Sequence, residues 1–163
     1  MLAVLIRRRD WAICLIFLVS TLPYWGAVGH DFHYDDFHSV VRNPHIRVWE
    51  NIPSFFIEPT FFSVNPESAM YRPVLLFSYA LNYAWGGYHP AGYHLINVLI
   101  HGINAVLVWA LVRTMVVKHE IALVAALLFG LTPLNSEAVH YISSRSEIMM
   151  ATFFMCLYGL SAF

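Results

Sequence analysis

Apolar residues along the chain gather into four long runs that polar stretches separate. The first run, residues 11–28, holds no charged residue, and the others lie at about 93–117, 121–136 and 148–163. Runs of this length predict helices that cross a bilayer, because a span needs about 20 mostly apolar residues. We therefore expect an all-α, polytopic membrane protein with four spans.

Positive residues give these spans a direction. Arg7 to Arg9 precede the first run, and Arg113 and Lys118 follow the apolar part of the second. Both groups are predicted to face the cytoplasm, because Lys and Arg collect in cytoplasmic loops. The segment 29–92 and the short loop 135–147 then lie outside. The tight turn at Lys118 predicts that the second and third spans form an antiparallel pair.

A cleaved signal peptide is the alternative interpretation of the first run. Basic residues precede the run, and Ala27 to Gly29 resembles a small-residue cleavage site. The length of the run, its two tryptophans and Pro23 favour an uncleaved anchor that bends near its outer end. In either case the chain from His30 onward emerges on the outer side.

Two stretches of the outer segment predict helices that lie along the membrane surface. Residues 49–62 mix aromatics with prolines, and Asn51 to Pro53 resembles a helix start. Residues 73–85 are apolar but too short to cross, and two glycines follow them as a helix stop. The alternative is that both stretches pack as the core of an outer domain.

Composition supports the membrane assignment. The chain has 163 residues, of which 59% are hydrophobic and 12% charged, and its mean hydropathy is +0.60. These values lie outside the range of soluble domains. No basic patch suited to nucleic acid is present. Cys14 and Cys156 lie in apolar runs, where cysteine acts as a small hydrophobe, so they predict neither a disulfide nor a metal site.

Carboxylates and imidazoles crowd the start of the outer segment. Residues 30–38 hold three of the ten acidic residues and three of the nine histidines. Such groups move protons, bind metals or do both, although a solvated turn also favours them. One option is a divalent cation, Mg²⁺ or Mn²⁺, held by Asp35, Asp36 and His33.

Four polar residues of the second run are spaced so that they share one helix face. Polar groups within a membrane normally face the protein interior or a wet cavity. Three interpretations stay open: hydrogen bonds between helices, a polar headgroup site, and ligation of a haem, which needs a second histidine on a facing helix. The four residues are His94, Asn97, His101 and Asn104.

Four blocks in a fixed order resemble a known family. They are Tyr34 to Pro44, Tyr71 to Tyr83, Gly92 to His101 and Pro133 to Glu147. This order is similar to the membrane half of the transmembrane and tetratricopeptide-repeat-containing O-mannosyltransferases and their prokaryotic relatives, within the GT-C glycosyltransferases. The resemblance covers nearly the whole chain, and it implies a GT-C-like membrane domain with a structured first outer loop.

The resemblance implies transfer of a sugar, mannose in this family, from a polyprenyl- or dolichyl-phosphate donor to an acceptor hydroxyl of protein Ser/Thr or a glycan. In the superfamily an acidic pair in the first outer loop carries the catalytic base. The matching positions are Asp35 and Asp36, with Asp35 the expected base. Thr132 stands where the family often has a histidine. The family's repeats and later spans are absent, so residues 1–163 are expected to be a fragment.

Transfer from a lipid phosphate also needs positive charge near the leaving group. Arg72 and Arg145 are the outer-side arginines beside family-like blocks, and arginine binds phosphate oxygens bidentately. Glu137 and His140 are expected to assist them. The alternative for Arg72 is a surface pair with Glu67, which would contribute little.

Two non-enzymatic hypotheses stand beside the glycosyltransferase. In one, the histidine-rich outer loop binds a transition metal; in the other, the protein binds haem. The enzyme hypothesis gives Asp35 the main role and leaves His33 and His38 dispensable, whereas metal binding reverses this. An enzyme of this kind is expected in the inner membrane of a prokaryote or the endoplasmic reticulum membrane of a eukaryote, with its site on the outer or lumenal face.

Overall fold

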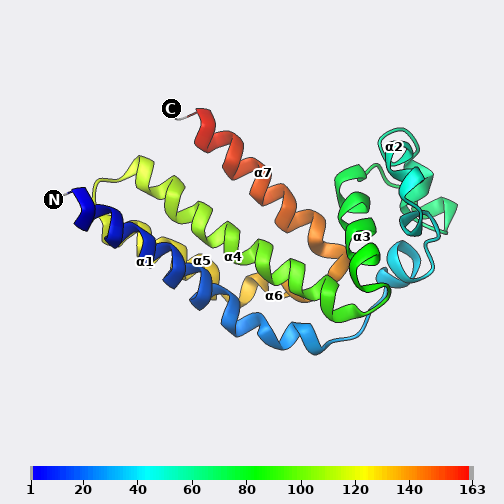
Figure 1. Cartoon of the computed structure of the whole chain (residues 1–163), viewed down its shortest axis with the longest axis horizontal. Helices are drawn as coiled ribbons and strands as arrows, with labels where there is room; N and C mark the ends of the chain where they lie inside the picture. Colours follow the sequence, from blue (N-terminus) through cyan, green and yellow to red (C-terminus); the bar gives the residue numbers. More distant parts are fainter. Residues whose placement is uncertain (1, 162–163) are drawn as a thin grey trace.

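A computed structural model describes residues 2–161, with the side chains of residues 11–160. The described residues form helices and no strand, which confirms the all-α fold class (Figure 1). The α-helices are α1 (Leu2–Thr21), α2 (Ile52–Phe55), α3 (Pro73–Gly86), α4 (Pro90–Met115), α5 (His119–Leu131), α6 (Ser136–His140) and α7 (Arg145–Ser161). Short 3₁₀ segments and one π-helical segment, Phe37–Val41, connect them.

Within the part of the chain that the structure describes, two stretches are long and apolar enough to cross a membrane. Trp11–Gly29 joins the end of α1 to a 3₁₀ segment that begins at Leu22, one residue before Pro23. α4 supplies the other stretch, with a mean hydropathy of 2.1. A third crossing exists if α5 and the helical stretch Pro133–His140 form one bent span. The crossing of α7, and hence the four-span topology, stays a prediction.

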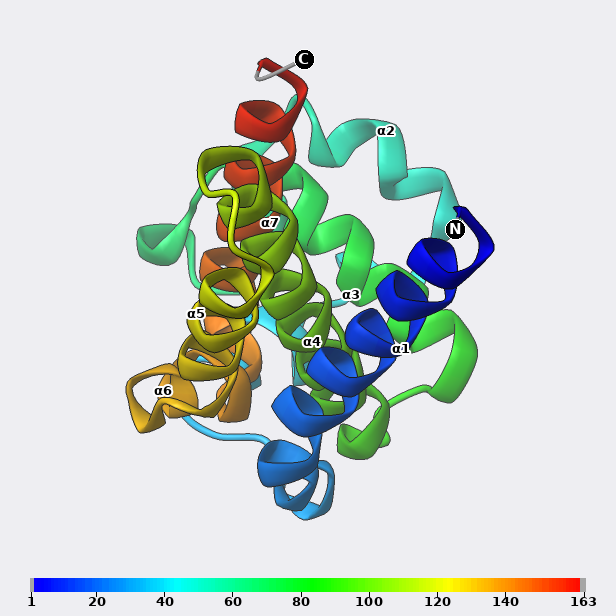
Figure 2. The same cartoon turned by 90° about the vertical axis from the view of Figure 1, so that its left-hand side faces the viewer.

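The membrane part is built around α4, which packs against α1, α5 and α7. Figure 2 shows α4 in the middle, with α1 and α5 on either side. Ala12 and Ile16 of α1 are buried against Ala105 of α4 and Ala126 of α5. α1 thus contributes to this core, and the assignment of the first run as an uncleaved anchor stays a prediction.

The predicted third span, 121–136, is not one continuous helix. α5 ends at Leu131, and Thr132 is extended (ψ 128°) because Pro133 disfavours helical backbone in the residue before it. The chain bends by 47° at this break. Beyond the bend, α6 packs against α4.

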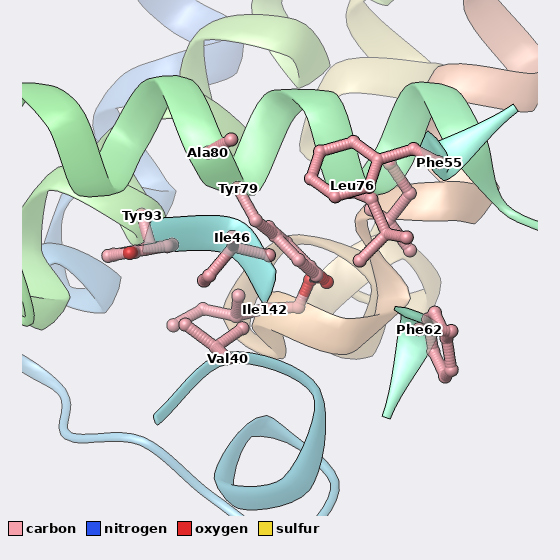
Figure 3. Close-up of a cluster of buried hydrophobic side chains, with 10 residues drawn as sticks. Val40, Ile46, Phe55, Phe62, Leu76, Tyr79, Ala80, Tyr93 and Ile142 are labelled. Atoms are coloured by element: carbon pink, nitrogen blue, oxygen red, sulfur yellow. Dashed lines mark hydrogen bonds between the residues drawn. The ribbon is translucent and has the colours of Figure 1, made fainter. Parts of the chain in front are cut away.

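The outer segment packs into a hydrophobic core that also includes Tyr93 and Ile142 from outside the segment, which agrees with the alternative interpretation. Figure 3 shows Tyr79 and Leu76 of α3 packed with Val40, Phe62 and Ile142, which come from three other segments. The predicted helix over 49–62 is interrupted: α2 covers four residues, and a 3₁₀ turn begins at Pro59. Glu58 is extended because it precedes a proline.

α3 does not continue into α4. Gly87 has φ 59°, a conformation that glycine adopts without strain, and it turns the chain between the two helices. Figure 1 shows α3 directed away from the axis of α4. This agrees with the predicted orientation; contact of α3 with the membrane surface stays a prediction.

The predicted topology can be tested by cysteine labelling of the full-length protein without its native cysteines. Pro66 and Lys118 are both exposed; Pro66 precedes α4 in the sequence and Lys118 follows it. We expect an impermeant maleimide to label a Pro66→Cys variant from the outer side and a Lys118→Cys variant only after the membrane is opened. Labelling of both cysteines from one side would refute the topology.

Candidate functional site

Asp36 fastens the first outer loop to the segment between α6 and α7. Its Oδ1 accepts hydrogen bonds from the Ser143 N–H (2.9 Å) and Oγ–H (2.6 Å), and its Oδ2 accepts one from the His33 N–H (3.0 Å). Asp36 is 1% exposed. Burial raises the pKa of this carboxyl above its usual value, an effect that the three donors partly offset. The two loops therefore meet here, although 107 residues separate Asp36 from Ser143 in the sequence.

Asp35 points the other way, into solvent. Its side chain is 65% exposed, and its Oδ1 lies 3.4 Å from Nε2 of His38. The backbone N–H of Asp35 donates to the Tyr141 hydroxyl (3.0 Å). Tyr34, directly before it, has a left-handed backbone (φ 41°), which is costly for a tyrosine and shapes the turn. Of the predicted acidic pair, one carboxylate is structural and the other is accessible.

Arg145 occupies the protein interior, which corrects its predicted role as a phosphate ligand. It is 0% exposed, and its guanidinium lies over the Tyr79 ring. Burial lowers its pKa to about 10, so it stays charged at neutral pH. Its donors are used within the protein: Nε–H binds Asn97 Oδ1 (2.7 Å), Nη1–H binds Asn82 Oδ1 (2.7 Å) and Ser78 Oγ (3.0 Å), and Nη2–H binds the Tyr93 carbonyl (2.8 Å).

Arg72 is the outer-side arginine that borders an accessible cavity. Its Nη1–H donates to Ser146 Oγ (3.2 Å), and its guanidinium lies 5.5 Å from the Phe62 ring centre. No Arg72–Glu67 ion pair appears among the described residues. A cavity of about 440 Å³ runs from Arg72 and Ser146 between α3 and α7. Its other lining residues are apolar: Pro73, Val74, Leu75, Met149, Met150, Phe153, Phe154 and Leu157.

The polar stripe of α4 binds helices together. Asn97 Nδ2–H donates to the Tyr141 carbonyl (3.1 Å), and Asn104 donates to the Ile148 carbonyl (2.8 Å). His101 Nε2 lies 3.1 Å from the Gly130 carbonyl of α5. These three side chains are buried and engaged, so the interpretation as hydrogen bonds between helices is the one that the structure supports for them.

His94, the first residue of the stripe, differs from the other three. Both of its ring nitrogens are buried and make no hydrogen bond of good geometry, and the Asp31 backbone lies beside the ring. Its ring centre lies 6.1 Å from that of His30, and His30 stacks on His140 at 5.4 Å.

His140 is half-buried and bonded to the Ser136 carbonyl, whereas Glu137 is exposed. The structure thus places His140 and Glu137 away from the Arg72 cavity lining.

The predicted cation ligands do not fit one metal site. Asp36 Oδ1 accepts two hydrogen bonds from Ser143, and Oδ2 accepts one from His33. Across residues 11–160, no three His, Cys, Asp or Glu side chains are grouped as metal ligands. A divalent cation at Asp35 stays a prediction.

One four-residue segment, Ser143–Ser146, brings the candidate groups together. Ser143 binds Asp36, Arg145 holds α3 and α4, and Ser146 binds Arg72. Three residues of chain span at most about 11 Å. The Asp36 side chain and the end of the cavity at Arg72 therefore lie close to each other. Sequence reasoning missed Tyr141, Ser143 and Ser146, although all lie within the block that carried the resemblance.

These features define an all-α membrane protein with an accessible carboxylate and a cation-capped apolar cavity on its predicted outer side. The chain is 33% identical over 142 residues to the protein O-mannosyl-transferase tmtc2 of Xenopus laevis, covering 84% of this chain and 17% of that protein. It is 29% identical over 149 residues to the protein O-mannosyl-transferase F38B6.6 of Caenorhabditis elegans (86% and 21%). Human TMTC3, also named a protein O-mannosyl-transferase, is 27% identical over 149 residues (90% and 16%).

The resemblance to the TMTC family is therefore confirmed over most of the chain, which spans about a fifth of the length of these relatives. No protein-family model matches the chain. No solved structure matches it either.

Removal of the Asp36 carboxylate should loosen the docked loop. Asp36→Ala leaves three donors without an acceptor, which we expect to cost about 2–3 kcal/mol. Hydrogen exchange in the full-length protein should show faster exchange of the His33 and Ser143 amides. Asp35→Ala is the matched control because it removes the exposed carboxylate of the adjacent residue. It should leave both amides protected.

The pH dependence of this docking follows from the raised pKa of Asp36. The folded state holds the proton to a higher pH than the unfolded chain, so stability is lost as the pH rises through the Asp36 pKa. Asp36→Asn should remove this component, and the stability difference between the two proteins should therefore change with pH above about 4. A pH-independent difference would contradict the assignment.

Proposed function

We propose that this chain forms part of a membrane glycosyltransferase that transfers mannose from a polyprenyl- or dolichyl-phosphate donor to a protein Ser/Thr hydroxyl. The observation that carries the proposal is the meeting of an exposed carboxylate, Asp35, and a cation-capped apolar cavity at the Ser143–Ser146 segment. The names of the relatives support the reaction class.

Asp35 is the proposed base. The acceptor oxygen bonds to C1 of the sugar as the bond from C1 to the phosphate oxygen breaks, and the hydroxyl proton passes to the carboxylate. Asp35 suits this role because it is exposed and rigidly connected: its backbone N–H binds Tyr141, and the adjacent Asp36 is fixed to Ser143. Asp36 is then a positioning residue, since its oxygens are already engaged.

The cavity between α3 and α7 suits the lipid part of the donor. Its long wall of methionine, phenylalanine and leucine side chains matches an isoprenoid chain, and Arg72 at one end can bind the phosphate. As the bond to the sugar breaks, negative charge grows on the phosphate, and a nearby guanidinium stabilises it. Ser146 holds this guanidinium in place.

In this proposal the reaction takes place on the outer side of the membrane. Asp35 and Arg72 both belong to the segment 29–92, which the distribution of Arg and Lys predicts to be outside. That side is the lumen of the endoplasmic reticulum in a eukaryote and the periplasmic or extracellular face in a prokaryote.

The first test of the proposal is Asp35→Asn in the full-length enzyme. The amide cannot accept the hydroxyl proton, so turnover should fall by about 100-fold or more while donor-lipid binding stays near its original value. Transfer of labelled mannose to an acceptor peptide and binding of a donor analogue measure the two quantities. Turnover at the original rate would refute Asp35 as the base.

The second test concerns Arg72. Arg72→Ala should raise the KM for the donor by about 10- to 100-fold, because a charge-assisted phosphate contact is lost. Arg47, an exposed outer-segment arginine that lies over the Tyr88 ring, provides the matched control Arg47→Ala. Equal donor KM values for the two variants would contradict the proposed phosphate site.

A further inference from the structure

The Asp35 carboxylate contacts His38, and His38 in turn contacts Ser63. Nε2 of His38 lies 3.4 Å from Asp35 Oδ1, and Nδ1 of the same ring lies 2.9 Å from Ser63 Oγ. The Ser63 oxygen also accepts a hydrogen bond from the Asn65 N–H (2.9 Å). Ser63, His38 and Asp35 therefore form one chain of polar contacts that runs from the buried outer core to solvent.

The proton positions in this chain follow from its surroundings. Ser63 is 5% exposed, so its hydroxyl hydrogen needs a partner within the protein, and Nδ1 of His38 is in position to accept it. The neutral imidazole then carries its proton on Nε2, facing Asp35. The opposite tautomer would place a lone pair against a carboxylate oxygen. A protonated imidazole also presents Nε2–H, so both charge states direct a donor at Asp35.

The arrangement resembles a nucleophilic triad only in its residue types. The serine is buried and the carboxylate is 65% exposed, which is the reverse of a triad with an accessible serine nucleophile. The accessible end is Asp35. The chain of contacts therefore acts on the carboxylate and not on Ser63.

The backbone around this chain is held firmly. The Val64 N–H donates to the His38 carbonyl (3.3 Å), and Ser39 Oγ–H donates to the Asp35 carbonyl (2.8 Å). The buried Asn43 amide donates to the carbonyls of Phe61 and Phe62, directly before Ser63. Both partners of His38 are thus attached to the same packed outer core.

We propose that His38, with its tautomer set by Ser63, is a positioning residue for the base Asp35. Its Nε2–H holds Oδ1 and leaves Oδ2 free to receive the proton of the acceptor hydroxyl. The contact of 3.4 Å is long for a hydrogen bond and shortens when the acceptor is bound. This inference rests on the proposed function, and it reverses the expectation that His38 is dispensable.

Two isosteric variants of the full-length enzyme test the inference. In His38→Gln the side-chain amide reaches the place of Nε2 and keeps a donor toward Asp35. In His38→Asn the amide matches Nδ1, contacts Ser63 and falls short of Asp35. We expect the Gln variant to keep kcat within about 3-fold and the Asn variant to lose about 10- to 100-fold, both with unchanged donor KM. His89→Ala, which alters an exposed histidine of the outer segment, is the control and should be unaffected.

A double-mutant cycle separates this inference from the proposed function. If His38 acts through Asp35, His38→Asn should cause no further loss in an Asp35→Asn background. Equal kcat for the Gln and Asn variants, or additive losses, would overturn the positioning role while Asp35 remains the base. Full activity of Asp35→Asn alone would overturn the proposed function itself. Ser63→Ala should lower kcat by a smaller factor, because it frees the tautomer without removing Nε2.

Discussion

The fold depends on the placement of one charged group, the guanidinium of Arg145. Removal of a guanidinium from water costs several kcal/mol, and here no carboxylate forms an ion pair with it among the described residues. Four hydrogen bonds and two aromatic rings take the place of its hydration. These partners belong to α3 and α4, so the charge at the start of α7 connects three helices. Loss of Arg145 would leave this set of oriented acceptors without a donor.

The position of Arg145 explains why distant parts of the sequence meet at one site. Ser143 and Ser146 lie within two residues of it, and the fixed backbone there gives Asp36 and Arg72 their partners. Asp35 and His38 are then oriented from the other side by the outer core. The candidate site is a junction between a rigid membrane part and a packed outer segment, and neither part contains it alone.

Much of this arrangement could be predicted from the sequence, and the limits have physical causes. The apolar runs predicted α1, α4 and α5, and the spacing of the stripe predicted a shared face, because both signals are local and periodic. The sequence could predict that Asp35 and Asp36 have different roles. It could not show which carboxylate is buried, because that depends on Ser143, 107 residues from Asp36. The burial of Arg145, predicted as a phosphate ligand, could not be foreseen for the same reason. Its acceptors, Asn82 and Asn97, come from helices that the linear sequence does not place beside it.

The close contact of α1 with α5 has a consequence for how the protein is made. A Cβ at Gly130 would clash with the side chain of Ser20, so the two helices meet here nearly backbone to backbone, with the Gly130 Cβ position 3.3 Å from the Ser20 Cα. Ser20 is synthesised early, whereas Gly130 follows 110 residues later (130 − 20). Until α5 is synthesised, the Ser20 side chain lacks the Gly130 surface that covers it in the folded protein. Its final environment exists only once the ribosome has produced α5.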